Sequence, residues 1–186
     1  YVLNQFSMDE HDGVLRVATT EPSFWGWWGN DEESESHVSV LGEASGALVE
    51  LGHVGGLGKG ERIYSVRFMG ERGYVVTFRQ VDPLYVLDLS DATNPTVTGE
   101  LKIPGFSSYM HPIDDDHLLT IGRDATDEGV VQGLQFQIFD VSDPAEPLEV
   151  SVWQAPGAWN DIGWEHRSFL WWEPEQLAVI PVNVGE

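Results

Sequence analysis

The sequence predicts an all-β protein, a β-propeller of four-stranded antiparallel blades. An apolar strand pattern recurs along the chain, and a strand-and-turn motif occurs twice with the same ending. Apolar residues do not repeat at the 3.6-residue helical period, apart from a weak pattern at 162–171. Four short strands per repeat are typical of propeller blades. A single β-sandwich is the alternative architecture, but it does not explain the repetition.

The first recurring element is an apolar strand that follows a turn. It starts at Gly13, Gly73, His117 and Leu177, so the intervals are 60, 44 and 60 residues. The shortest interval has the size of a four-stranded blade. The two longer intervals leave room for loop insertions.

The second recurring element is a strand that ends in Asp-x-Ser-Asp and is followed by proline. Residues 84–91 lead to Pro95, and 52 residues later residues 136–143 lead to Pro147. Asp and Ser side chains accept hydrogen bonds from nearby backbone N–H groups, and proline cannot continue a strand ladder. Both segments are therefore predicted to be a strand followed by a tight turn.

The repeats divide the chain into units. Residues 63–68 and 107–111 are taken as fourth strands, each closing the unit before it. The predicted units are the last strand of a preceding blade (1–12), three blades (13–72, 73–116 and 117–176) and the first strand of a following blade (177–186). Closed propellers usually have about four to eight blades. We therefore expect part of a larger propeller, whose remaining blades belong to the same polypeptide and complete the ring.

Several runs of residues also indicate a family. They are Glu61–Gly70, Gly73–Asp91 and Ile103–Ile113, with Tyr1–Met8 and Leu15–Thr20 also fitting. The chain resembles bacterial and archaeal secreted proteins that contain a C-terminal β-propeller domain distantly related to WD40 repeats. The resemblance implies an extracellular or cell-surface location. It implies no known activity and no catalytic residues.

The charge balance restricts the partners. Nine Lys and Arg residues face 31 Asp and Glu residues, so the formal net charge is −22. Such a surface repels phosphate backbones and anionic lipids, which argues against nucleic acid. No apolar stretch approaches the roughly 18 residues of a membrane-spanning helix, so no membrane insertion is expected. Two explanations of the acidity stay open, adaptation to high salt and the binding of divalent cations.

One acidic loop is a candidate metal site. Asp124, Asp127 and Glu128 lie within five residues and are followed by Gly129. Carboxylate oxygens are the ligands that Ca²⁺ prefers, but the loop lacks the spacing of an EF-hand. A solvated hairpin tip is the favoured interpretation, so no cofactor is expected, with Ca²⁺ as the alternative.

Tryptophan is the most unusual component, at eight residues. Trp25, Trp27 and Trp28 lie in an insertion directly before an acidic run at 31–35, and a second group contains Trp159, Trp164, Trp171 and Trp172. Exposed aromatic rings bind sugars and flat protein surfaces. The first cluster is a candidate ligand or partner contact; packing over the ends of blades is the competing interpretation.

The sequence therefore favours a non-enzymatic extracellular binding or scaffold module that presents its loops to a protein or glycan partner. It contains no Gly-x-Ser-x-Gly nucleophile motif and no cysteine. The alternative is a polysaccharide hydrolase or lyase that uses carboxylates at the mouth of the propeller. That chemistry needs two carboxylates roughly 5–9 Å apart in a concave site.

Overall fold

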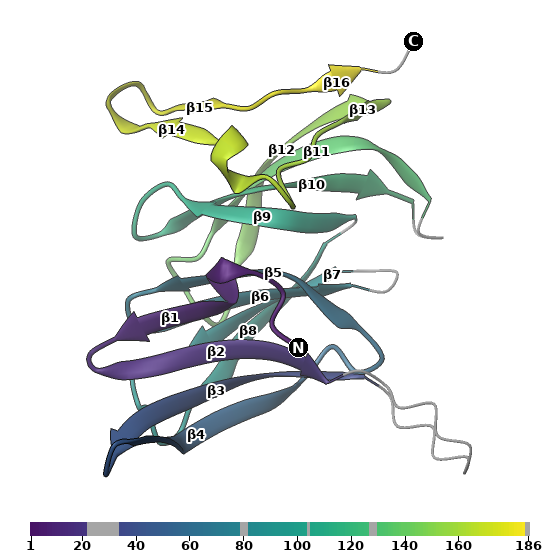
Figure 1. The fold of residues 1–186 in the computed structure, drawn as a ribbon. Coiled ribbons are helices and arrows are strands. Elements are labelled where there is room, and N and C mark those ends of the chain that lie inside the picture. The colour runs from purple at the N-terminus through teal and green to yellow at the C-terminus, as the bar shows by residue number, and fades with distance from the viewer. Residues whose placement is uncertain (22–33, 79–81, 104, 127–129, 185–186) are drawn as a thin grey trace, which may run out of the picture.

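The computed structural model describes residues 1–21, 34–78, 82–103, 105–126 and 130–184. Three antiparallel sheets of four strands each account for most of them (Figure 1). Sheet A contains β1 (Met8–His11), β2 (Val14–Glu21), β3 (Glu35–Ala44) and β4 (Ala47–Leu57). Sheet B contains β5 (Arg62–Met69), β6 (Arg72–Phe78), β7 (Asp82–Asp88) and β8 (Thr96–Ile103). Sheet C contains β9 (Phe106–Pro112), β10 (His117–Ala125), β11 (Val131–Asp140) and β12 (Leu148–Pro156).

The C-terminal residues form two smaller sheets against sheet C. They contain the pairs β13 (Ala158–Trp159) with β16 (Asn183–Val184) and β14 (Leu170–Trp172) with β15 (Leu177–Val179). The described residues contain no α-helix, only the 3-10 turns η1 (Gln5–Ser7), η2 (His166–Ser168) and η3 (Glu173–Glu175). None of the helices in the described ranges has the length and apolar character that a membrane crossing needs.

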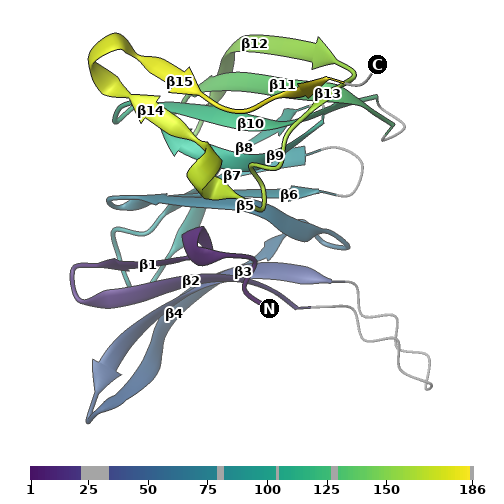
Figure 2. The same ribbon diagram turned by 45° about the horizontal axis from the view of Figure 1, so that its top comes forward.

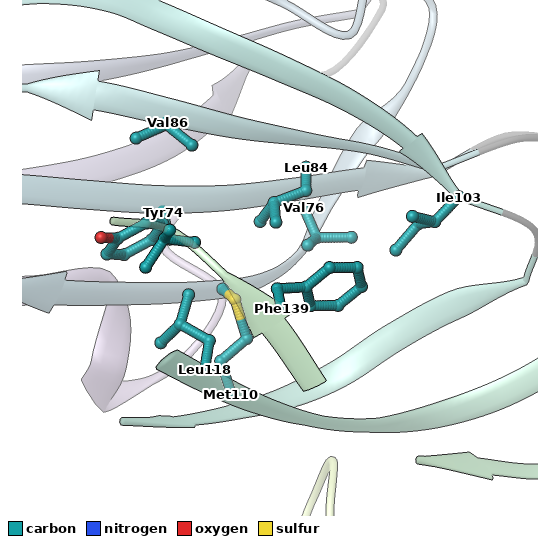
Figure 3. Close-up of a cluster of buried hydrophobic side chains, with 9 residues drawn as sticks. Tyr74, Val76, Leu84, Val86, Ile103, Met110, Leu118 and Phe139 are labelled. Carbon is teal, nitrogen blue, oxygen red and sulfur yellow. The ribbon is translucent and has the colours of Figure 1, made fainter. Parts of the chain in front are cut away.

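The three sheets stack face to face, as Figure 2 shows. Neighbouring residues of a strand point to opposite faces, so sheet B contributes to a core on each side. Val75 packs with Ala18 and Val38 of sheet A, whereas the next residue, Val76, packs with Phe139 of sheet C. The second of these cores also holds the residues drawn in Figure 3, among them Tyr74, Leu84, Val86, Ile103, Met110 and Leu118. The predicted propeller stacking of blades is confirmed, and the sandwich alternative is wrong.

The first strands of the sheets lie on the inside of the stack. The Ser65 hydroxyl of β5 donates to the Ser107 carbonyl of β9 at 2.8 Å, which joins sheets B and C. The Ile63 backbone N–H of β5 donates to the Thr20 hydroxyl of β2 at 3.1 Å, which joins sheets A and B. The fourth strands lie outside, where β4 exposes Leu48. Buried hydroxyl groups therefore connect the blades near their inner edges.

The strands group differently from the sequence expectation. Residues 63–68 do not close the unit that begins at 13; they open sheet B by pairing with β6. Likewise, β1 pairs with β2 in sheet A, and 177–179 pairs with β14, so it is not the first strand of its unit. Residues 1–7 hold η1 and no strand. The predicted unit boundaries at 13 and 73 fall in tight turns, in which Gly13 and Gly70 have φ +80° and +52°. Such turns join two neighbouring strands of one sheet, so they do not separate blades.

Both Asp-x-Ser-Asp segments form the predicted strand and turn. The Ser90 N–H donates to Asp88 Oδ1 and the Ser142 N–H to Asp140 Oδ1, each at 2.9 Å. Hydrogen bonds from the serine side chains, followed by these backbone bonds, lower the pKa of Asp88 and Asp140. The turn chemistry inferred from the sequence is confirmed.

The same turns pack against the outer strand of the preceding blade, at a glycine in each case. A Cβ on Gly52 of β4 would meet the carbonyl groups of Ala92 and Thr93, and one on Gly99 of β8 would meet the carbonyl of Pro144. Both glycines admit a close approach of backbone to backbone. The repeated motif is therefore a contact between blades as well as a turn.

The stack is an open arc. Sheet A and the C-terminal strands lie at its opposite ends, and neither pairs with the other (Figure 1). The described residues thus form three complete four-stranded blades and a partial unit that do not close into a ring, in agreement with the predicted part of a larger propeller.

Candidate functional site

A cavity of about 910 Å³ opens beside the inner strands, at the end where β5 and β9 begin. The first residues of β5 and β9, the end of β10 and the segment 160–166 after β13 all contribute to its wall. Its volume is at the upper end of the range of about 300–1,000 Å³ that is usual for small-molecule sites. The cavity is therefore the candidate functional site.

Arg62 stands on an aromatic wall of the cavity. Its Nη2 donates to the Tyr64 hydroxyl at 2.7 Å, and its guanidinium carbon lies 4.8 Å from the centre of the Tyr64 ring. The Tyr64 ring in turn lies 5.1 Å from that of Phe106 and 5.4 Å from that of Phe78. Cation–π contact and the single hydrogen bond orient the guanidinium and leave its other N–H donors for a ligand.

A second guanidinium reaches the cavity from the neighbouring blade. Arg123 of β10 lines it and is the backbone partner of Phe106 in β9. Arg123 forms no ion pair or side-chain hydrogen bond with the residues that the structure describes. Because guanidinium donors prefer planar oxyanions, this unengaged group favours a negatively charged ligand.

Asn160 supplies a buried amide to the same cavity. Its Oδ1 accepts a hydrogen bond from the Ile162 N–H at 3.4 Å, and its side chain is 9% exposed. The amide Nδ2 has no partner among the described residues. A buried donor without a partner costs free energy, so a ligand acceptor at this point would stabilise the site.

Trp164 stands at the rim of the cavity and is 88% exposed. The turn that presents it is fixed, because the Trp164 N–H donates to the Asp161 carbonyl at 2.9 Å and Ile162 is buried in the core against sheet C. A Cβ on Gly163 would lie 3.2 Å from Ser108, so the segment also lies close against β9. An exposed indole held by a rigid turn offers a flat apolar face to a ligand.

The charge of the cavity is opposite to that of the chain. No Asp or Glu occurs among the described residues that line it, whereas the whole chain carries a net charge of −22. Two carboxylates next to it in sequence are engaged elsewhere: Glu61 accepts a hydrogen bond from Thr77, and Glu165 pairs with Arg167. The described lining therefore makes the cavity a local basic site on an acidic protein.

The sequence-predicted contact residues lie largely outside the described ranges. Trp25, Trp27 and Trp28 are not described, and their role stays a prediction. The flanking residue Ser34 is described, and its carbonyl accepts a hydrogen bond from the Gly60 N–H at 2.8 Å. The four tryptophans of the second group occupy different places: Trp164 lines the cavity, Trp171 packs 5.7 Å from the His111 ring, and Trp159 and Trp172 are exposed.

Of the candidate metal ligands, only Asp124 is described. It lies in β10 opposite Gly133, and Asp127 and Glu128 lie outside the described residues. The part of the chain that the structure describes contains no group of three or more His, Asp or Glu residues arranged to hold a metal ion. The calcium hypothesis for this loop stays a prediction.

Sequence reasoning missed Arg62, Arg123 and Asn160. They come from three segments and share no motif. One sequence feature could have drawn attention to the arginines, namely the scarcity of basic residues. The whole chain has only nine, and two of them line this cavity.

Comparisons with known proteins agree with the fold. The family model described as "Beta propeller domain" matches residues 1–186. An uncharacterized protein of Methanocaldococcus jannaschii is 40% identical over 97% of this chain and 27% of its own length. An uncharacterized protein of Archaeoglobus fulgidus is 45% identical over 91% of this chain and 24% of its own length. The chain thus spans about a quarter of these relatives, and it belongs to the β-propeller domain family.

Proposed function

We propose that this chain is a non-enzymatic binding module of a larger β-propeller, with its ligand held in the cavity beside the inner strands. The observation that carries the proposal is the composition of this cavity. Two guanidinium groups, a buried amide nitrogen without a partner among the described residues and an exposed indole converge on one space. Concave sites with a few convergent polar groups are the usual places of ligand binding.

The alternative, a carboxylate-based hydrolase or lyase, needs a facing pair of acids. The described residues of this cavity include none, so the chemistry would have to occur elsewhere in the protein. His166 is the one imidazole in the described lining, and its Nδ1 lies 3.1 Å from the Ile162 carbonyl oxygen, which fixes the ring. The arrangement supports binding better than acid–base catalysis.

The experiment is a glycan and small-acid array probed with the purified protein and with Trp164→Ala. Trp153→Ala serves as the control, because Trp153 is also exposed, on the outer strand β12, but does not line the cavity. We expect ligands whose signal is lost in Trp164→Ala and kept in Trp153→Ala, with no release of reducing ends from bound polysaccharides. Cleavage of a bound polysaccharide would contradict the non-enzymatic proposal.

We also propose that the module acts outside the cell or on its surface, on the strength of the resemblance to secreted propeller proteins. Protease treatment of intact cells tests this. Degradation of the protein before lysis supports the proposal, and protection until lysis contradicts it.

Further blades of the same polypeptide are proposed to cover the outer face of β14 and β15. Leu170, Trp172, Leu177 and Val179 are 46–54% exposed on this face, and the cross-strand pairs Leu170–Val179 and Trp172–Leu177 join them. The relatives are long enough to provide more blades, because the chain matches only about a quarter of each. Contiguous apolar surface of this kind is usually covered by a partner.

The complete polypeptide provides the test of ring completion. Trp172→Lys should lower its melting temperature by several degrees, since a buried interface would receive a charge. Leu48→Lys on the outer strand β4, where the leucine is 61% exposed, is the matched control and should change little. Equal small effects of both substitutions would contradict the proposal.

A further inference from the structure

We infer that the cavity binds an acidic saccharide, one whose sugar ring carries a carboxylate. The inference rests on the proposed binding function and names its ligand class. It follows from four side chains of the cavity wall, Arg62, Arg123, Asn160 and Trp164, which together match the two parts of such a ligand, its carboxylate and its ring.

The carboxylate is matched by the arginines. Arg62 is held over the Tyr64 ring and donates one N–H to the tyrosine hydroxyl. Arg123 has no ion-pair partner among the residues that the structure describes. Planar guanidinium groups bind carboxylates through two parallel N–H donors. In a chain with 31 acidic residues, an arginine that pairs with no carboxylate of the described ranges is consistent with a site for an external carboxylate.

The sugar ring is matched by Trp164 and Asn160. The indole is 88% exposed at the rim, and the apolar face of a pyranose ring packs against such a surface. The Asn160 Nδ2 donor is buried and has no partner in the part of the chain that the structure describes, so it would donate to a ring or hydroxyl oxygen. A free carboxylate or phosphate ion would leave both groups unused, and a cavity of about 910 Å³ is much larger than such an ion requires.

The test compares uronic acid oligosaccharides with their methyl esters by isothermal titration calorimetry. A panel of di- and trisaccharides that contain glucuronate, galacturonate, mannuronate or guluronate is the probe. The ester keeps the ring and removes the charge. We expect at least one acid to bind and its ester to bind roughly 10- to 100-fold more weakly, the loss that corresponds to one charged hydrogen-bonded contact.

Variants locate the effect. Arg123→Gln and Arg62→Gln should weaken the acid roughly 10-fold or more and leave the ester unchanged, whereas Trp164→Ala should weaken both. Arg167→Gln is the control, because Arg167 lies on the surface and pairs only with Glu165 among the described residues. If Arg62→Gln does not fold, the Arg123 variant and the acid-to-ester ratio of the unmodified protein still decide the question.

The results of these binding measurements distinguish the acidic-saccharide inference from the proposed binding function. Equal binding of acid and ester, lost in Trp164→Ala, would overturn the acidic ligand and keep the binding function. Tighter binding of glucose 6-phosphate than of every uronate would overturn the carboxylate in favour of phosphate. Binding that Trp164→Ala leaves intact would overturn the cavity as the site. No binding by any member of the panel would overturn the acidic saccharide, while the array experiment above decides the binding function.

Discussion

The guanidinium of Arg67 lies 4.1 Å from the centre of the Phe6 ring, which attaches the N-terminal 3-10 turn to the inner strand of sheet B. Its Nε also donates to the Met110 carbonyl of sheet C at 2.9 Å. One side chain thus joins three parts of the fold that are far apart in sequence. Burial lowers the pKa of Arg67, and the carbonyl and the ring offset this cost of desolvation.

Replacement of Arg67 should therefore destabilise the arc. We expect Arg67→Ala to lower the free energy of unfolding by about 2–3 kcal/mol and Arg67→Lys by about 1–2 kcal/mol, because lysine keeps the charge and loses the planar donors. Urea unfolding followed by far-UV circular dichroism measures both. Arg167→Ala, on the exposed surface, is the control and should have no measurable effect. Equal urea midpoints for Arg67→Ala and Arg167→Ala would contradict the conclusion that Arg67 joins these three parts of the fold.

Gly99→Ala should also destabilise the protein, through the contact between blades. An added Cβ would clash with the Pro144 carbonyl oxygen, which belongs to backbone that cannot move aside cheaply. We expect a loss of about 1–3 kcal/mol in urea unfolding, as is usual for overpacking. Gly55→Ala is the control, because its Cβ would meet the end of the flexible Glu35 side chain at 3.3 Å and lie in ordinary contact with the His37 Cβ at 3.8 Å. A neutral Gly99→Ala would mean that the turn does not pack there.

His111 should make stability depend on pH between about 4 and 6.5. Burial, with a smaller contribution from Arg67, lowers the pKa of His111 from 6.5 to about 4. The folded protein then binds fewer protons than the unfolded chain, so the contribution of His111 is complete above pH 6.5 and is lost as the pH falls toward 4. The Phe169 and Trp171 rings surround the imidazole at 4.7 and 5.7 Å.

The difference between the unmodified protein and His111→Phe isolates this contribution from that of other groups. Melting temperatures measured from pH 7 to pH 4.5 should fall more steeply for the unmodified protein. Proton NMR of the imidazole should give a midpoint near 4. A midpoint near the ordinary value of 6.5 would contradict the burial argument.

Salt should stabilise the protein. With a net charge of −22, screening of mutual repulsion is expected to raise the melting temperature steadily between low salt and about 1 M NaCl. Millimolar CaCl₂ should match NaCl of equal ionic strength if the acidic loops are simply solvated. A flat response to NaCl would remove the high-salt interpretation. A rise specific to Ca²⁺ and reversed by EDTA would favour the cation site at 124–129.

The sequence by itself determined the fold class, because strand alternation and turn chemistry are local. The segments Leu84–Asp91 and Phe136–Asp143 specify a strand and a side-chain-capped turn within a few residues, and the structure has both. The spacing of these repeats also indicated several stacked blades in an open arc. The grouping of strands into sheets was wrong by one strand, because the same hairpin pattern is compatible with a blade boundary at either side of the turn at Gly70.

Only the tertiary structure decided where a site lies. Arg62 and Arg123 are 61 residues apart, and neither is distinguished by its neighbours in sequence. They meet because β5 and β9 lie side by side, joined by the Ser65–Ser107 hydrogen bond, which brings the starts of two blades together. Asn160 is buried there because the packing of Ile162 against sheet C holds its segment in place. Local patterns fix strands and turns, whereas a cavity depends on contacts between blades, and these contacts form only when the whole stack is assembled.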